Sequence, residues 1–363
     1  MPQLKMTVSC PVHHSFRVKQ IGGLFNVPLE EKIRESFSVE VPDLNDDWNI
    51  GLIVGPSGSG KTTVARQIFK GSFYLGGSWP HDKAVIDAFP QNFSIKEITG
   101  MFTSVGFSSP PSWIKPYHVL SNGERFRCDL ALALSQGSDG EIVAFDEFTS
   151  VVDRDVARVT SATISKGIQN HLIPKRFVAI TCHYDIISWL QPQWILDMAS
   201  GTFSRRRLRR PRIQLEIVRC RREAWKLFAR HHYLSGSLAP ACRTYMALWE
   251  GKPVSFCGIL PVVCKKGHWR FSRVVTLPDF QGMGIGMRFI ESIAEMYIEN
   301  HERINITGSH PAVIAHCKKS PLWKTVNVSQ AKNRPVHSPV FGYRGADSRI
   351  VVSFEYTGRK ITK

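Results

Sequence analysis

The residues whose types could do chemistry begin with a glycine-rich loop. Residues Gly55–Thr63 read Gly-Pro-Ser-Gly-Ser-Gly-Lys-Thr-Thr, which fits the pattern G-x-x-x-x-G-K-[ST] without a mismatch. In such a loop the backbone N–H groups face phosphate oxygens, the lysine reaches the β- and γ-phosphates, and the threonine hydroxyl binds Mg²⁺. The loop therefore predicts a site for a nucleoside triphosphate. Its expected contacts are Gly55, Ser57, Gly58, Gly60, Lys61, Thr62 and Thr63.

Two carboxylates later in the chain are of the kind that phosphate hydrolysis needs. The segment 141–147 reads Glu-Ile-Val-Ala-Phe-Asp-Glu, a buried strand pattern that ends in Asp146 and Glu147. The first carboxylate suits Mg²⁺ through water, and the second can orient or deprotonate an attacking water. A further apolar run, 178–182, delivers His183 at its end.

Other polar residues lie between the loop and the end of this region. Gln91 follows an apolar patch, and residues 120–125 read Leu-Ser-Asn-Gly-Glu-Arg before an Ala/Leu-rich helix at Cys128–Leu134. Ser121 and Gly123 stand where the N-terminus of that helix can hold phosphate.

Short strands and helices must position these residues. Ile50–Val54 is an apolar strand directly before the glycine-rich loop, and Thr63–Phe69 reads as a helix directly after it. This order of strand, loop and helix is what the phosphate-binding geometry requires.

The order of these segments resembles the ABC ATPase family over roughly residues 20–204. The resemblance implies a parallel-sheet core, an ATP-dependent homodimer and catalytic roles for Asp146, Glu147 and His183. It also implies Mg²⁺ ligands at Thr62, Gln91 and Asp146, and ATP contacts from the signature residues Ser121 and Gly123. Asp153 matches the D-loop aspartate, and Phe25 and Phe37 remain alternatives for stacking on adenine.

The chain departs from the family pattern in two places. Asn122 and Glu124 replace the usual glycine and glutamine of the signature, and Glu124 is expected to add negative charge near phosphate. Few residues separate Lys61, Gln91 and Ser121, which leaves little room for a transporter-sized helical subdomain, and no coiled-coil insertion is present. We therefore expect an ABC-type ATPase that is not a transporter.

A second glycine-rich loop lies in the C-terminal part of the chain. Gln281–Gly286 reads Gln-Gly-Met-Gly-Ile-Gly and lies between a strand, Trp269–Leu277, and an amphipathic helix, Met287–Asn300. Such a turn can cradle pyrophosphate, but its spacing is not that of a dinucleotide fingerprint. It resembles the Q-x-x-G-x-G signature of the GNAT acetyltransferases. The resemblance implies acetyl-CoA bound by Gln281, Gly282, Gly284 and Gly286.

The residues that would carry out acyl transfer are less clearly marked. GNAT enzymes commonly use a tyrosine as general acid, whereas the corresponding helix here, Ala312–Lys318, holds His316 and Cys317 but no tyrosine. The segments 231–236 and 309–311, taken with the glycine-rich loop, resemble the Mom-type phage proteins, GNAT-like enzymes that modify adenines in DNA. Candidate transferase residues are His232, Tyr233, Ser235, Ser309 and His310.

Charge is distributed unevenly along the 363 residues. Residues 1–204 hold 18 Lys and Arg against 20 Asp and Glu, while residues 205–363 hold 29 against 10. A segment this basic suits a polyanion, because each neutralised phosphate releases counterions. No apolar run is long enough to span a bilayer, no secretory signal pattern begins the chain, and the cysteines are scattered. We expect a cytoplasmic protein without a membrane partner.

These observations predict an α/β protein in which a P-loop ABC ATPase domain is followed by a smaller GNAT-like α/β domain. The expected boundaries are 1–204 for the ATP-binding domain, 205–222 for a basic linker with six arginines at 205–212, and 223–363 for the acyltransferase domain. The leading hypothesis is an ATPase coupled to an acyl-CoA-dependent transferase that modifies nucleic acid, with DNA favoured over RNA. The alternatives are an ATP-driven RNA acetyltransferase and an ATP-switched nucleic-acid-binding defence protein with a non-catalytic GNAT fold.

Overall fold

The chain forms two compact α/β units, each assembled from separated stretches of sequence. The computed structural model describes residues 3–27, 32–206, 208–232, 237–330 and 350–358. Unit 1 comprises Met1–Leu75, Gly137–Ser150 and Pro174–Arg209, and unit 2 comprises Gly76–Gln136, Val151–Ile173 and Arg210–Lys363.

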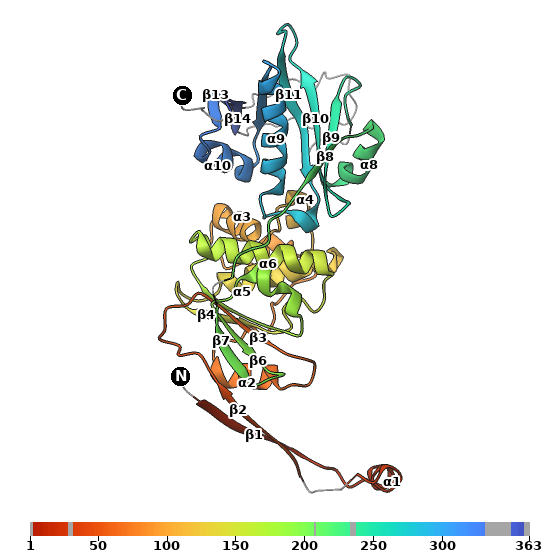
Figure 1. Cartoon of the computed structure of the whole chain (residues 1–363), viewed down its shortest axis with the longest axis vertical. Helices are drawn as coiled ribbons and strands as arrows, with labels where there is room; N and C mark the ends of the chain where they lie inside the picture. Colours follow the sequence, from red (N-terminus) through yellow and green to blue (C-terminus); the bar gives the residue numbers. More distant parts are fainter. Residues whose placement is uncertain (1–2, 28–31, 207, 233–236, 331–349, 359–363) are drawn as a thin grey trace. The chain divides into compact units, whose positions relative to one another are not determined.

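Unit 1 is built on a five-stranded sheet whose first four strands are parallel (Figure 1). In spatial order the strands are β4 (Ile142–Phe145), β5 (Arg176–Thr181), β3 (Ile50–Val54), β6 (Trp194–Asp197) and the antiparallel edge strand β7 (Thr202–Arg205). All five residues of β3 are buried, as expected for a central parallel strand. Helices α2 (Lys61–Ile68) and α7 (Ile187–Leu190), with the short η3 (Tyr184–Ile186), also belong to this unit.

The parallel order places the predicted catalytic segments at one edge of this sheet. The loop follows β3, Asp146 follows β4, and His183 lies two residues beyond β5. Because neighbouring parallel strands present their carboxyl ends at the same edge, residues far apart in sequence meet there.

A two-stranded ribbon extends from unit 1. It pairs β1 (Gln3–Pro11) with β2 (Lys32–Glu40), and α1 (Phe16–Phe25) lies between the strands at the end of the ribbon (Figure 1). Helix α1 is capped by Ser15, whose hydroxyl accepts from the Val18 N–H. The sequence did not predict β1 or α1. Phe25, one candidate for stacking on adenine, is 70% exposed on α1, and the side chain of the other candidate, Phe37, lies outside the described part of the chain.

Unit 2 combines a group of helices with a seven-stranded sheet (Figure 1). The helices that come first in sequence are η1 (Val85–Ala88), α3 (Ile95–Ser104), α4 (Pro110–Trp113), η2 (Tyr117–Val119), α5 (Asn122–Ser135) and α6 (Arg154–Gln169). The strands in spatial order are β13 (Trp323–Gln330), β14 (Ile350–Tyr356), β12 (Arg303–Gly308), β11 (His268–Thr276), β10 (Lys252–Pro261), β9 (Arg243–Trp249) and β8 (Glu216–Arg219).

The β11–α9–β12 unit positions the second glycine-rich loop. Strands β11 and β12 are the parallel pair in this otherwise antiparallel sheet, and α9 (Ile285–Glu299) crosses between them. The short η6 (Pro278–Phe280) joins β11 to the loop, and α10 (Pro311–Lys319) follows β12. A parallel pair needs such a crossover, and the glycine-rich turn therefore opens a helix, as predicted.

One expected helix is interrupted. The sequence predicts a continuous helix over Arg222–His231, whereas the structure has three short pieces, η4 (Arg222–Ala224), α8 (Trp225–Phe228) and η5 (Ala229–His231). Trp225 and Phe228 are buried against Phe256 of β10, so packing of aromatic rings rather than helical periodicity sets this segment. Among the described residues, no helix is long and apolar enough to cross a membrane.

Gly51 of β3 tests how tightly the core of unit 1 is packed. A Cβ added there would lie 2.0 Å from Cζ2 of Trp194, a side chain that is 1% exposed. Gly51→Ala should therefore lower the free energy of unfolding by about 2 kcal/mol, because overpacking forces buried neighbours out of place. Thermal and urea denaturation of the full chain measure this loss. Gly23→Ala on α1, where nothing lies within 4 Å, is the matched control and should leave the midpoint unchanged or slightly higher. An equal midpoint for both variants would contradict the packing argument.

Candidate nucleotide and coenzyme sites

The first glycine-rich loop connects β3 to α2, and its lysine lies inside the loop. Lys61 is the first residue of α2 and only 9% exposed, and its Nζ donates to the carbonyl of Pro56 at 2.7 Å. The ammonium therefore already lies at the centre of the loop. The Ser59 hydroxyl is buried and has no hydrogen-bond partner among the described residues. A buried cation and a buried unpaired hydroxyl fit a phosphate ligand.

A hydrogen bond joins this loop to the end of β4. Thr62 Oγ1 donates to Asp146 Oδ1 at 3.2 Å, and the backbone N–H of Glu147 donates to the same oxygen at 3.0 Å. A hydroxyl and a carboxylate side by side next to a phosphate loop are the protein ligands that Mg²⁺ takes, with phosphates and water completing its coordination. The residues present therefore fit a magnesium ion.

Glu147 and His183 lie near this pair in unit 1. Glu147 is exposed, its φ is 49°, and its Oε2 accepts from the Ser150 hydroxyl at 2.6 Å. The left-handed backbone costs energy for a residue with a Cβ, and the hydrogen bond from Ser150 fixes the carboxylate direction. His183 Nδ1 lies 3.4 Å from the hydroxyls of both Thr149 and Thr181.

The remaining predicted ATP contacts belong to unit 2. Gln91 is exposed just before α3, Ser121 is the N-cap of α5, and Gly123 lies in the first turn of that helix. Asp153 is the N-cap of α6, where its carboxylate accepts from two backbone N–H groups. The contacts of these residues with ATP stay predictions.

The unusual glutamate of the signature is engaged within its own helix. The Glu124 carboxylate accepts from the N–H and hydroxyl of Ser121 at 3.0 and 2.9 Å, and from the Ser112 hydroxyl at 2.7 Å. Burial raises the pKa of the Glu124 carboxyl, but the hydrogen bonds together lower this pKa by more than burial raises it. The pKa of Glu124 is therefore below its usual value. The capping box that uses this charge, S-x-x-E, was present in the sequence but was not singled out there.

The second glycine-rich loop opens α9 in unit 2. Gly284 is the N-cap of this helix with φ 91°, a conformation that favours glycine. A Cβ at Gly282 would lie 2.6 Å from Thr163 Cγ2, and one at Gly286 would lie 2.5 Å from Thr276 Oγ1. At Gly284 the nearest atom would be Lys166 Nζ, at 3.5 Å. Of the three glycines, only Gly284 would accept a Cβ at ordinary van der Waals distance, and a pyrophosphate at this turn stays a prediction.

Two cations accompany Gly284. Lys166 Nζ donates to the Gly282 carbonyl at 3.4 Å, and burial together with the charge of Arg210 lowers the pKa of Lys166. Nε and Nη2 of Arg210 are buried without a hydrogen-bond partner in the described part of the chain. A half-buried Lys166 at the N-terminus of a long helix favours an anion there, and the charge of Arg210 acts on the same lysine. The sequence did not single out Lys166, because it lies on α6, far from the loop along the chain.

Gln281 has a structural role in this loop. Its Oε1 accepts from the Ser108 N–H at 3.0 Å, and its Nε2 donates to the Thr276 carbonyl at 2.9 Å. The side chain that was predicted to bind the coenzyme therefore joins the start of the loop to the end of β11 and to the segment between α3 and α4.

Three transferase candidates can be placed, and Tyr233 and Ser235 lie outside the described residues. Burial and the charge of Arg273 lower the pKa of His232 to about 4, so its imidazole is neutral near pH 7. His310 is the N-cap of α10, where Nδ1 accepts from the Ala312 N–H at 3.3 Å. Ser309 is partly buried beside it. A neutral imidazole can accept a proton, and these residues stay candidates.

The two alternatives on α10 are engaged elsewhere. His316 Nε2 lies 2.7 Å from Glu291 Oε1, to which Trp323 Nε1 also donates at 3.1 Å. Cys317 is 1% exposed, and burial raises the pKa of its thiol to about 12. A buried thiol of this pKa stays protonated and packs as a small apolar group.

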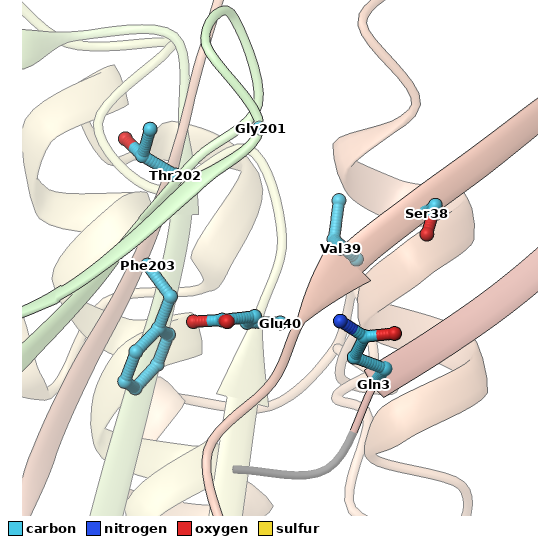
Figure 2. Close-up of a pocket in the computed structure, with 7 residues that line it drawn as sticks. All are labelled: Gln3, Ser38, Val39, Glu40, Gly201, Thr202 and Phe203. Carbon is cyan, nitrogen blue, oxygen red and sulfur yellow. The ribbon is translucent and has the colours of Figure 1, made fainter.

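A surface hollow in unit 1 contains none of the motif residues. Figure 2 shows its lining, which comes from the base of the β1–β2 ribbon and from the turn into β7. The lining residues are Gln3, Ser38, Val39, Glu40, Gly201, Thr202 and Phe203. Concavity alone therefore does not identify the nucleotide site, which is defined by its loop and carboxylates.

Comparisons with known proteins bear on both halves of the chain. Residues 208–315 match the family model described as "Acetyltransferase (GNAT) family". No curated protein matches the sequence significantly. An IAA acetyltransferase from Bacillus cereus is 14% identical, with 39% of this chain and 99% of that chain covered and a TM-score of 0.32. The ribosomal-protein-S18-alanine N-acetyltransferase from Escherichia coli is 12% identical, with 41% and 99% covered and a TM-score of 0.30.

The other half is similar to nucleotide-binding cassettes. A dimeric bacterial ABC transporter cassette is 16% identical, with 50% of this chain and 93% of that chain covered and a TM-score of 0.38. Scores of this size leave the assignment of the nucleotide site to its own geometry. The family match is specific to one segment, and the chain contains a GNAT acetyltransferase domain over residues 208–315.

Proposed function

We propose that this protein hydrolyses ATP at the Gly55–Thr63 loop and transfers an acyl group from coenzyme A to nucleic acid, with DNA favoured as acceptor. The observation that carries the ATPase part is the 3.2 Å hydrogen bond from Thr62 to Asp146, which joins the phosphate loop to the acidic end of β4. The family match over residues 208–315 supports the transferase part. The basic C-terminal region supports the choice of acceptor.

Each residue of the nucleotide site has a distinct task in this proposal. Lys61 would exchange the Pro56 carbonyl for phosphate oxygens, and Thr62 and Asp146 would hold Mg²⁺. Gln91 stays the third ligand that the sequence predicts. A bound magnesium neutralises charge that develops on the phosphates. Glu147, oriented by Ser150, positions the attacking water, and His183 contacts the phosphate end of the site.

Glu147→Gln tests the hydrolytic role. The amide keeps the size of the side chain but cannot accept a proton, so turnover should fall at least ~100-fold while ATP still binds. Phosphate release measures turnover, and size-exclusion chromatography with ATP should show a dimer that separates without it. Lys61→Ala is the contrasting variant and should lose nucleotide binding itself, because the phosphates lose their closest counterion. Unchanged turnover in Glu147→Gln would remove Glu147 from the mechanism.

The proposed coenzyme site uses the N-terminus of α9 and two cations. The backbone at Gly284 would face a pyrophosphate, and Lys166 of α6, whose Nζ would lie 3.5 Å from a Cβ at Gly284, would offset its charge. Arg210, whose charge acts on Lys166, would add to the positive potential there. Acetyl-CoA supplies the activated acyl group. Neutral His232, with His310 and Ser309, remains the candidate to remove a proton from the acceptor amine.

Lys166→Gln tests the coenzyme site without altering the glycine turn. Losing a charge-assisted contact should weaken acetyl-CoA binding about tenfold, measured by calorimetry on the full chain, and leave ATP turnover intact. Lys252→Gln is the control, because Lys252 pairs with Asp155 at the other end of α6.

Gly284→Val should abolish binding and product, although its φ of 91° also strains the new residue, so its melting temperature must be compared. Wild-type affinity in Lys166→Gln would refute the assignment.

The arginine run at 205–212 is part of the proposed nucleic-acid surface. Arg205 pairs with Asp46 and Arg210 is half-buried, whereas Arg206, Arg209 and Arg212 are exposed. Replacing these three by Gln should reduce the slope of log affinity against log salt by about 2–3, since each phosphate contact contributes about 0.9. Fluorescence anisotropy with duplex DNA measures the slope. An unchanged slope would show that these arginines do not contact phosphate and belong to a solvated linker.

Mass spectrometry of nucleosides distinguishes the three functional hypotheses. A new deoxynucleoside that depends on this protein supports DNA modification, and a new ribonucleoside supports the RNA acetyltransferase. If neither forms although ATP-dependent binding to nucleic acid persists, the GNAT domain is non-catalytic and the ATP-switched binding protein is correct.

A further inference from the structure

The coenzyme loop is held by three helical segments of unit 2 that precede the GNAT domain in sequence. The Ser108 N–H, between α3 and α4, donates to Gln281, and Lys166 of α6 donates to the Gly282 carbonyl. The backbones approach closely, because a Cβ at Gly282 would lie 3.0 Å from Cα of Gly106. The third segment is α5, which reaches the entrance of the loop through Arg127 and Asp279.

Arg127 is a fully buried charge with incomplete pairing. It is 0% exposed on α5, and its Nη1 lies 3.6 Å from Oδ1 of Asp279, whose side chain is 52% exposed. That separation suits an ion pair but is longer than a hydrogen bond. None of its three guanidinium nitrogens has a hydrogen-bond partner among the described residues. Because burying a charge is costly unless its partners are well placed, this arrangement needs an explanation.

Two further carboxylates act on the same guanidinium. Burial lowers the pKa of Arg127, and the charges of Asp279, Glu124 and Asp153 oppose this shift. Glu124 belongs to the signature segment, and Asp153 caps α6 in the position that resembles the D-loop. Gly123 also lies close, since a Cβ there would be 3.8 Å from Arg127 Nη1. Arg127 therefore lies between residues predicted to respond to ATP and a residue that begins the coenzyme loop.

We propose that Arg127 is a positioning residue that transmits the state of the ATP site to the coenzyme loop through Asp279. The inference rests on the proposed function and names its route of coupling. Asp279 lies in η6, which leads directly into Gln281 and the glycine turn. When ATP contacts the signature segment, α5 shifts and Arg127 moves relative to Asp279. The shift of Asp279 moves η6, and this changes how the N-terminus of α9 contacts pyrophosphate. An under-paired buried charge suits such a two-state contact, because a small shift exchanges one carboxylate partner for another.

Asp279→Asn tests the coupling between Arg127 and the coenzyme loop at its exposed residue, where a substitution should leave the fold intact. Acetyl-CoA affinity is measured by calorimetry on the full chain, with and without a non-hydrolysable ATP analogue and Mg²⁺. In the wild-type protein the analogue should change this affinity at least ~5-fold, and acetyl-CoA should change analogue affinity by the same factor. In Asp279→Asn the ratio should fall to about one while each ligand still binds alone.

Two further variants separate coupling from structural support. Glu250→Gln removes the exposed ion pair with Arg158 of α6 and should keep the wild-type ratio. Arg127→Lys keeps the charge but loses the planar fork, so it should give an intermediate ratio. Its melting temperature is measured alongside, because Arg127 is fully buried. A wild-type ratio in both Asp279→Asn and Arg127→Lys would overturn the proposal, as would a wild-type protein that binds both ligands without mutual effect. In that second case the proposed function stands. If wild-type protein does not bind acetyl-CoA, the transferase function fails and this inference fails with it.

Discussion

Close backbone approach at Gly282 is the constraint on which the organisation of unit 2 depends. A side chain there would collide with Thr163 of α6 and with Gly106 before α4. Two glycines facing each other let the backbone at Gly106 approach the backbone at Gly282, beside the contacts that the Lys166 and Gln281 side chains make. A contact of this kind transmits displacement, because close-packed atoms cannot absorb it by changing rotamer. The glycine pattern of this loop therefore reflects protein packing as well as the coenzyme binding that we propose.

The nucleotide site depends on a different constraint, the shared edge of parallel strands. Strand β3 carries the phosphate loop, and β4 and β5 deliver Asp146 and His183 beside it. The Thr62–Asp146 hydrogen bond fixes the distance between loop and carboxylate. Glu147 and Thr149 have left-handed backbone conformations, which turn their side chains away from the directions that an extended strand end would give them. Backbone strain at such positions persists only where the surroundings hold it.

Buried charges at the coenzyme site are placed with few partners. Arg127, Lys166 and Arg210 are each wholly or partly desolvated, and burial lowers the pKa of all three. Charges in such surroundings interact strongly with any anion or carboxylate that approaches, because little water screens them. Weak screening by water lets charged residues from segments before and within residues 208–315 interact with the same loop. The match to the acetyltransferase family covers residues 208–315.

The sequence by itself determined the local units of this protein. Ile50–Val54, the phosphate loop and the helix after it were predictable because strand, loop and helix are consecutive. The same holds for the strand, glycine turn and helix around Gly284. The ribbon of β1 and β2 was not predicted from the sequence, because its pairing joins distant segments. Over Arg222–His231 the sequence predicted one helix, whereas aromatic packing gives three short helices. Tertiary structure alone decided that Gly282 meets Thr163, that the Ser112 hydroxyl donates to Glu124, and that Arg127 pairs with Asp279. Periodicity and motif spacing report what neighbours along the chain do, whereas burial and charge pairing depend on segments that only folding brings together.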